Sequence, residues 1–238
     1  SFEIVRPTSL ADAVAALGQD EAQALAGGQT LIPSLKQRLA QPSVLVSLTA
    51  IAEMQGVSAE GGVLTLGGGT THGTVAREAA AHYPALAALA SNIGDPAVRN
   101  RGTVGGSLAN NDPAACYPAA ALASGATIVT NSREIAMEDY FQGMFTTALE
   151  EGEIITAVRF PIPEKAAYIK FEQPASRFAL VGVFVAKFAD GVRVAVTGAS
   201  EEGVFRWTEA EEALSGNFSA TALDGLTVSA DGLMSDIH

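Results

Sequence analysis

Two short segments place paired glycines beside hydroxyl side chains, and these residues are the ones best suited to bind a reactive group. The first reads AGGQTLIP over residues 26–33, and the second reads NRGTVGGS over residues 100–107. Glycine has no Cβ, so backbone N–H groups in such segments can approach an anion closely and form a concave binding site. The chain carries neither a Walker nor a Rossmann fingerprint. Together the two segments predict an extended dinucleotide held at its pyrophosphate.

The other reactive side chains form no recognisable catalytic or metal site. Cys116 is the only cysteine, so the sequence provides no internal disulfide and no ligand set for an iron–sulfur cluster. The histidines His72, His82 and His238 form no HExxH-like pair, and the sequence has no GxSxG motif. We therefore assign no catalytic residue and no metal ligand, and we expect an organic cofactor to carry the chemistry.

Length and charge limit the class of protein. With 238 residues, of which 48% are hydrophobic, the chain can bury a large core divided over two or three domains or lobes. The net charge of −12 argues against a nucleic-acid partner, because phosphates are neutralised by Lys and Arg. No apolar run is long enough to cross a membrane and no signal peptide is visible, so we expect a cytoplasmic protein.

The N-terminal region follows a β-α-β-α-β pattern around the first glycine segment. Ser9 and Asp12 resemble a capping box at the start of a helix, and Gly18 is expected to end that helix. The glycine segment lies between a strand and the start of a helix, where free N–H groups and the helix dipole favour phosphate. The predicted elements are a strand at 2–5, a helix at 10–17, a strand at 22–26, a helix at 31–39 and a strand at 44–48.

The middle region is predicted to mix strands and helices. Pro161 and Pro163 end its last strand and mark our best domain boundary. The predicted elements are strands with tight turns within 57–69, helices at 74–81 and 85–93, a short helix at 119–122, and strands at 126–130 and 154–160.

The last region is predicted to contain a hairpin and a helix. Asp190-Gly191 between the β-rich runs 181–188 and 192–198 is a strong hairpin signal. Thr208 and Glu211 resemble a capping box for a helix through Leu214. Residues 226–228 resemble a strand, and Ser235–His238 add no closing element, so we expect a truncated C-terminus.

The glycine segments resemble the paired FAD motifs of molybdenum hydroxylase flavoprotein subunits. This group includes the medium subunit of carbon monoxide dehydrogenase, the type that the chain resembles most, and the FAD domain of xanthine dehydrogenase. The resemblance covers nearly the whole chain and includes RPTSL at 6–10, NNDP at 110–113 and QPASRF at 173–178. Cys116 departs from it, because many relatives carry an acidic residue there and cysteine is a poor hydrogen-bond acceptor.

The resemblance implies an α+β protein with a two-lobed FAD-binding fold of the vanillyl-alcohol-oxidase (PCMH) type and a small α+β C-terminal domain. The implied domains are lobe 1 at 1–54, lobe 2 at 55–163 and the C-terminal domain at 164–238. Both glycine segments would hold the pyrophosphate, and Ile93 and Gly94 would lie beside the isoalloxazine ring. Asn110 and Asp112 would contact the sugar and ribityl hydroxyls. The FAD-binding residues are expected to be Leu25, Ala26, Gly27, Gly28, Gln29, Thr30, Leu31, Ile93, Gly94, Thr103, Gly105, Gly106, Asn110 and Asp112.

The resemblance also implies a function in electron transfer. In such complexes a large subunit oxidises the substrate at a molybdenum cofactor, and a small subunit passes electrons singly through [2Fe–2S] clusters. FAD collects them and delivers them to an external acceptor. Two alternatives remain open: a self-contained FAD oxidase or reductase with the same cofactor fold, and a nucleotide-binding module without redox activity.

Several residues also have an interpretation that involves no ligand. Residues 67–71 form either a simple turn or a further wall of the same cleft. Ile93 suits a core position, and Asp112 before Pro113 suits a turn. His72 is expected to be a surface or capping residue. Cys116 is expected to be a small buried hydrophobe rather than a reactive thiol.

Overall fold

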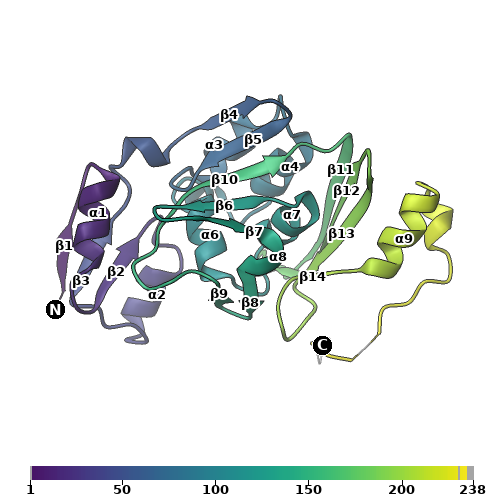
Figure 1. Cartoon of the computed structure of the whole chain (residues 1–238). Coiled ribbons are helices and arrows are strands. Elements are labelled where there is room, and N and C mark those ends of the chain that lie inside the picture. The colour runs from purple at the N-terminus through teal and green to yellow at the C-terminus, as the bar shows by residue number, and fades with distance from the viewer. Residues whose placement is uncertain (1, 230, 235–238) are drawn as a thin grey trace.

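The N-terminal region forms a small parallel sheet that places the first glycine segment at the end of a strand. The computed structural model describes residues 2–229 and 231–234. Three strands pair in the order β1-β3-β2, and all neighbours run parallel (Figure 1). The elements are β1 (Glu3–Val5), α1 (Leu10–Leu17), β2 (Ala22–Leu25), α2 (Leu31–Lys36) and β3 (Val44–Ser47), followed by the 3₁₀ turn η1 (Ala52–Met54). The predicted β-α-β-α-β order is confirmed.

Local signals set the helix boundaries of this region. The Ser9 hydroxyl accepts a hydrogen bond from the Asp12 N–H, as the capping box predicts. Helix α2 ends at Lys36, three residues before the predicted end at Leu39. The chain turns there because Arg38 adopts a left-handed conformation with φ of 61°.

The middle region is a five-stranded antiparallel sheet covered by short helices. Its strands pair in the order β4-β5-β10-β6-β7, so β10 inserts between two strands that lie far from it in sequence. The strands are β4 (Val57–Glu60), β5 (Val63–Gly67), β6 (Thr127–Thr130), β7 (Glu134–Ala136) and β10 (Ile155–Pro161), and β8 (Phe141–Gly143) and β9 (Thr146–Thr147) form a separate ribbon. The helices are α3 (His72–Glu78), α4 (Pro84–Ser91), α5 (Pro96–Arg99), α6 (Val104–Asn110), α7 (Tyr117–Ser124) and α8 (Met137–Tyr140).

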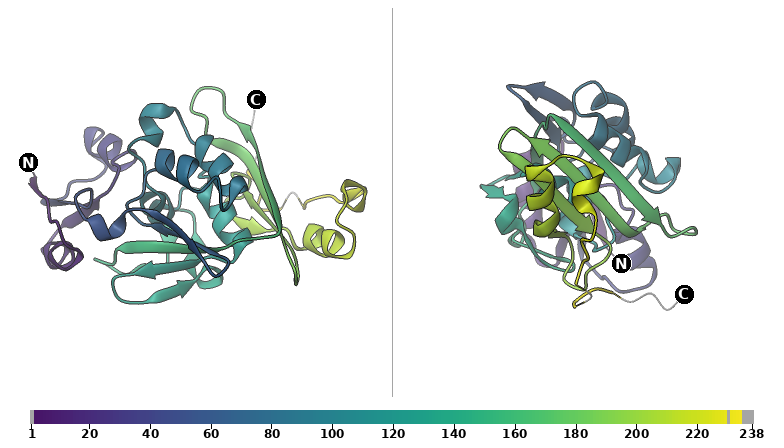
Figure 2. Two further views of the ribbon diagram at one scale, coloured as in Figure 1. Left: turned by 90° about the horizontal axis from the view of Figure 1, so that it is seen from above. Right: turned by 90° about the vertical axis from the view of Figure 1, so that its right-hand side faces the viewer.

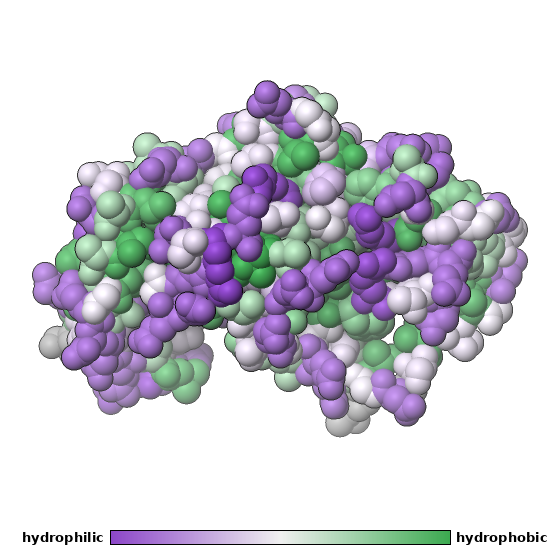
Figure 3. Space-filling view, viewed as in Figure 1, coloured by the Kyte–Doolittle hydropathy of each residue, from purple (hydrophilic) through white to green (hydrophobic). Residues whose placement is uncertain are grey.

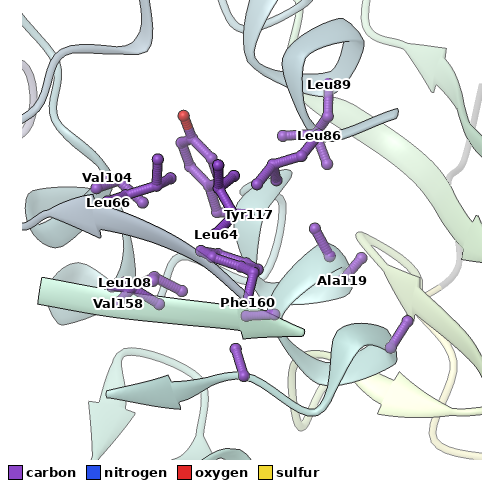
Figure 4. Packing of buried hydrophobic residues seen from close by; sticks show 14 of the residues in the cluster. Leu64, Leu66, Leu86, Leu89, Val104, Leu108, Tyr117, Ala119, Val158 and Phe160 are labelled. Atoms are coloured by element: carbon purple, nitrogen blue, oxygen red, sulfur yellow. The ribbon is translucent and has the colours of Figure 1, made fainter. Parts of the chain in front are cut away.

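The main core lies between this sheet and its helices. Leu64 on β5 and Phe160 on β10 project from the sheet toward Leu86 on α4, and Tyr117 on α7 lies between them (Figure 4). All four side chains are almost fully buried. Burying a side chain of this size contributes about 1.5–3 kcal/mol. The same cluster includes Val104 and Leu108 of α6, so it fixes the helix that carries the second glycine segment.

A four-stranded antiparallel sheet forms the C-terminal region and shares the same core. Its order is β11-β12-β13-β14, and the predicted Asp190-Gly191 hairpin joins β12 to β13. Phe184 and Ala195 pack into the core of the middle region, while α9 covers the opposite face of the sheet. The elements are β11 (Lys165–Glu172), β12 (Ala179–Phe188), β13 (Gly191–Thr197), β14 (Phe205–Arg206), α9 (Thr208–Gly216) and the 3₁₀ turn η2 (Ala220–Leu223).

The three sheets follow one another along an elongated molecule. The N-terminal sheet lies at one end and α9 at the other, in both Figure 1 and the left view of Figure 2. Pro161 ends β10 and Lys165 begins β11, so the predicted boundary falls between two sheets. Hydrophilic residues cover much of the face in Figure 3, in keeping with the net charge of −12.

Two local predictions in the C-terminal region are wrong. Trp207, and not Thr208, is the N-cap of α9, and the Glu211 carboxylate accepts hydrogen bonds from the Arg206 guanidinium at 2.6 and 2.7 Å instead of closing a capping box. Residues 226–228 form no strand: among the described residues they pair with no strand, and Leu226 packs against the apolar cluster between β13 and α9. The prediction about Ser235–His238 lies outside the described residues.

Candidate functional site

The first glycine segment presents consecutive backbone N–H groups that have no partner in the described part of the chain. It connects β2 to α2, and Gly28 has φ of 73°, a conformation that glycine adopts without strain. Within residues 2–229 and 231–234, the N–H groups of residues 27–30 donate no hydrogen bond. Successive N–H groups of this kind form an anion-binding nest. This segment can therefore hold a phosphate through its backbone.

The second glycine segment uses its N–H groups inside the protein. The Gly105 N–H donates to the Gly68 carbonyl at 2.9 Å. The Gly106 N–H donates to the Thr103 hydroxyl oxygen at 3.0 Å, because Thr103 is the N-cap of α6. These groups are thus satisfied before any ligand binds, and the segment can act on a ligand mainly through its shape and side chains.

The glycines of both segments allow three stretches of backbone to pack closely. A Cβ on Gly27 would overlap the Arg101 carbonyl, so the two segments lie directly against one another. A Cβ on Gly105 would lie 2.5 Å from the Gly68 carbonyl oxygen. Gly68 belongs to the 67–71 stretch for which the sequence left two interpretations open, and it does line the cavity described next.

One cavity of about 580 Å³ runs between the two segments, a size typical of cofactor sites. Every predicted FAD-binding residue lines it except Leu25. The Leu25 side chain instead lies within van der Waals distance of the position that a Cβ on Gly28 would occupy. The lining residues that the sequence prediction omitted include Gly68, His72, Val98, Ser107, Ile155, Ser176, Arg177 and Phe178.

Ser176, Arg177 and Phe178 lie in the loop after β11, so the C-terminal sheet contributes one wall of the cavity. This loop closes on itself, because the Gln173 N–H donates to the Phe178 carbonyl at 2.9 Å and the Arg177 N–H donates to the Gln173 carbonyl at 2.8 Å. Residues 173–178 are part of the family resemblance, and that resemblance is the one feature of the sequence that could have linked this loop to the site.

Next to this loop, the end of α4 supplies another part of the wall, because the Arg177 guanidinium reaches the Gly94 carbonyl at 3.5 Å. Gly94 has φ of 51°, and its carbonyl accepts a hydrogen bond from the Arg99 guanidinium at 2.8 Å. The same Arg99 nitrogen donates to the Ile93 carbonyl at 3.1 Å. Arg99 therefore fixes the backbone of Ile93 and Gly94, two residues predicted to contact the ring of the cofactor.

Asp112 and Cys116 also line the cavity, and each has a local structural role that involves no ligand. One Asp112 carboxylate oxygen accepts from the Ala114 N–H at 2.8 Å and forms a turn. Cys116 is buried, as predicted, and burial raises the pKa of its thiol. A thiol held in its neutral form is a small apolar group, in keeping with the sequence interpretation.

His72 is not the surface residue that the sequence suggested. It is 5% exposed, its ring lies 5.3 Å from that of Tyr117, and its Nδ1 has no hydrogen-bond partner within the described residues. Burial, with a smaller contribution from the Arg99 charge, lowers the pKa of His72 to about 4. The imidazole is therefore neutral at pH 7. Its Nε2 fills the space beside Gly102 that a Cβ would need.

In the part of the chain that the structure describes, no group of three or more His, Cys, Asp or Glu residues is placed to hold a metal ion. No helix among these residues is both long enough and apolar enough to span a membrane.

Comparisons with known proteins identify the family to which this chain belongs. Residues 1–163 match the family described as the FAD binding domain in molybdopterin dehydrogenase. The chain is 39% identical over 196 residues to the carbon monoxide dehydrogenase medium chain of Afipia carboxidovorans, a match that covers 78% of this chain and 68% of the relative.

Solved structures agree with the sequence matches. Carbon monoxide dehydrogenase from Hydrogenophaga pseudoflava superposes with a TM-score of 0.85 at 34% identity, over 93% of this chain and 83% of the other. Quinoline 2-oxidoreductase from Pseudomonas putida 86 gives a TM-score of 0.89 at 30% identity, over 100% and 89%. The chain therefore belongs to the FAD-binding subunits of the molybdenum hydroxylases, of the carbon monoxide dehydrogenase medium-chain type and related to the FAD-binding subunit of xanthine dehydrogenase.

Proposed function

We propose that FAD lies along the 580 Å³ cavity with its pyrophosphate on the N–H groups of residues 27–30. The observation that carries this proposal is the contrast between these free N–H groups and the N–H groups of Gly105 and Gly106, which donate hydrogen bonds within the protein. The donors are consecutive backbone N–H groups, and Gly27 and Gly28 have no Cβ that would keep a diphosphate away from them. Gln29, Thr30 and Leu31 follow at the start of α2, where their own atoms line the cavity.

The second segment would define the opposite wall of the pyrophosphate site. Thr103, Gly105 and Gly106 set the position of α6, which carries Ser107 and Asn110 along the cavity. The side chains of Ser107 and Asn110 make no hydrogen bond within the described residues, so both are free to bind hydroxyl or phosphate oxygens. The second carboxylate oxygen of Asp112 offers a similar acceptor. Ile93 and Gly94 would lie beside the isoalloxazine ring.

The protein would act as the electron-transfer subunit of a larger complex. Bound FAD would supply a group that accepts electrons singly and releases them in pairs. A partner small subunit would deliver electrons from its [2Fe–2S] clusters, after a partner large subunit has oxidised the substrate at a molybdenum cofactor. The residues of this chain bind and orient FAD and shield part of it from water.

The finer fold assignment is part of the same proposal. We assign residues 1–54 and 55–163 to the two lobes of a vanillyl-alcohol-oxidase-type FAD-binding fold and residues 164–238 to a C-terminal domain. The first two sheets fall within the first two ranges, and β11 to β14 fall within the third.

Flavin content and substrate reduction test the proposal. The purified chain should carry about one FAD per chain, and acid should release it, because no sequence motif marks a His, Cys or Tyr for covalent attachment of the flavin. An artificial reductant should bleach the bound flavin, whereas carbon monoxide, purines or aldehydes should not. Flavin reduction by one of these substrates with no partner subunit present would contradict the electron-transfer role and favour a self-contained oxidoreductase.

A further inference from the structure

Lys170 is a buried lysine behind the cavity wall that the proposed FAD contacts do not use. It lies on β11, and its side chain is only 4% exposed. Lysine is almost never buried to this extent unless its ammonium has partners. The nearest carboxylate, that of Glu172, lies 3.9 Å away and is half exposed, which makes it a weak partner.

Backbone carbonyls from two separate segments are the close partners of Lys170. Its Nζ donates to the Asn92 carbonyl at 2.6 Å and to the Arg177 carbonyl at 2.8 Å. Asn92 is the C-cap of α4, and Arg177 belongs to the loop after β11. The ammonium therefore connects two walls of the cavity that lie far apart in the sequence.

The loop that Lys170 holds is under local strain. Arg177 has φ of 61°, which costs a non-glycine residue about 1 kcal/mol or more. Such a conformation persists only where surrounding contacts fix it. The hydrogen bond from Lys170 to the Arg177 carbonyl is one of these contacts.

Positive charge gathers around the same wall. Arg99 donates to the Ile93 and Gly94 carbonyls, and the Arg177 guanidinium reaches the Gly94 carbonyl at 3.5 Å. Lys170 also lies beside the Cys116 thiol, whose pKa it lowers against the larger raising effect of burial. Two carboxylates, of Glu172 and Asp95, lie close in sequence to these groups, but Asp95 is engaged in capping α5.

We propose that Lys170 is a positioning residue for the flavin-ring end of the site: its ammonium fastens the 173–178 loop to the end of α4, and its charge favours the reduced, anionic flavin. The proposal rests on the placement of FAD given above. Lys170 does not line the cavity, so it acts through the backbone of Ile93, Gly94 and Arg177 and through its field. In a site of low dielectric, a fixed positive charge nearby is felt more strongly than in water.

Three substitutions separate the fastening from the charge. Lys170→Met removes both the donors and the charge, Lys170→Gln keeps a shorter donor without charge, and Lys170→Arg keeps both. Lys165→Met is the matched control, because Lys165 lies on the same strand with an exposed side chain. For each purified protein, FAD affinity is measured by titration of the apoprotein, and the flavin midpoint potential by stepwise reduction with dithionite beside a reference dye.

We expect Lys170→Met to weaken binding of oxidised FAD about tenfold, and of reduced FAD about tenfold further. The second factor lowers the midpoint potential by about 30 mV for a two-electron couple. Lys170→Arg should recover most of the potential, and Lys165→Met should match the wild type. If Lys170→Met does not fold, Lys170→Gln should still show the lowered potential.

The outcomes distinguish this inference from the proposed function. A wild-type chain that binds no FAD would contradict both. A wild-type chain that binds FAD, together with Lys170→Met or Lys170→Gln variants of unchanged affinity and potential, would contradict the role of Lys170 alone. A weaker affinity with an unchanged potential would overturn the charge effect.

Discussion

The two glycine segments look alike in sequence but differ in what their backbones do. In the first, the N–H groups of residues 27–30 have no partner within the described residues, and Gly28 takes a left-handed conformation. In the second, the N–H groups of Gly105 and Gly106 bond to the protein itself. The first segment leaves its donors free for the anion that we propose it binds, whereas the second segment uses its donors to pack against its neighbours.

This difference shows that a paired glycine does not by itself indicate a phosphate site. Glycine is required wherever a backbone approaches another group closely, and that group can be a ligand or another strand. Counting the partners of each N–H group separates the two cases. The substitutions below test whether the separation holds, in order of decreasing effect.

Gly105→Ala should give the largest loss of stability. Its Cβ would lie 2.5 Å from the Gly68 carbonyl oxygen in a buried position, so the backbone must shift. We expect the free energy of unfolding of the apoprotein to fall by about 3 kcal/mol, measured by denaturant titration. Gly216→Ala is the control, because nothing lies within 4 Å of its Cβ position. Unchanged stability in Gly105→Ala would show that the second segment is not a packing device.

His72, which packs against Gly102 of the second segment, should make the free energy of unfolding depend on pH. Its pKa is about 4 when folded and about 6.5 when unfolded, so the unfolded chain binds more protons between these values. Stability should therefore fall as pH decreases from 6.5 to 4, by up to about 3 kcal/mol. Glu153, whose pKa the Arg133 guanidinium lowers to about 2, contributes at lower pH, below about 4.5. The measurement is the unfolding free energy of wild type and His72→Gln at pH 4.5, 5.5 and 7. An equal slope in both proteins would refute the assignment to His72.

Gly28→Ala should affect FAD more than folding. The positive φ costs alanine about 1–2 kcal/mol, and relaxing it would move the unpaired N–H groups. Because charge-assisted hydrogen bonds are worth about 1.5–3 kcal/mol each, the Kd for FAD should rise at least about tenfold. Gly62→Ala is a control for the backbone conformation, with φ of 79° and open space around it, whereas a Cβ on Gly28 would also displace the end of the Ile32 side chain, 2.6 Å away. Equal FAD affinity in the two variants would remove the first segment from the phosphate site.

Thr103→Val should have the smallest effect, and this effect should be a loss of stability rather than of FAD affinity. It removes the hydroxyl that caps α6, which costs about 1 kcal/mol. The Kd for FAD should change by less than about threefold, because this hydroxyl is already bonded to the Gly106 N–H. Isothermal titration and thermal unfolding report the two quantities. A Kd raised tenfold at unchanged stability would mean that Thr103 contacts the cofactor directly.

Local signals were sufficient to predict several elements of the N-terminal and C-terminal regions. The capping box at Ser9, the strand–glycine–helix order around Gly28 and the Asp190-Gly191 hairpin all depend on neighbouring residues, and all are found. Helix α6 was not predicted, because Gly105 and Gly106 have poor helix propensity. Burial and the Thr103 cap stabilise it, and burial depends on the tertiary structure.

The sequence prediction included the glycine-rich part of the cavity wall and omitted residues that reach the wall through long-range packing. His72 looked like a surface histidine because nothing in its neighbourhood indicates that Tyr117 will pack against it. Lys170 reaches Asn92 across a large separation in sequence, and pairing of β10 between β5 and β6 is equally non-local. Residues 173–178 were noticed in the sequence only because they are part of the family resemblance.

Amide hydrogen exchange, followed residue by residue in ¹H–¹⁵N spectra with and without FAD, tests the central claim most directly. In the apoprotein the N–H groups of residues 27–30 should exchange rapidly, while those of Gly105 and Gly106 should be protected by their internal partners. Adding FAD should protect residues 27–30 and leave Gly105 and Gly106 nearly unchanged. New protection at Gly105 and Gly106, with none at residues 27–30, would contradict the account.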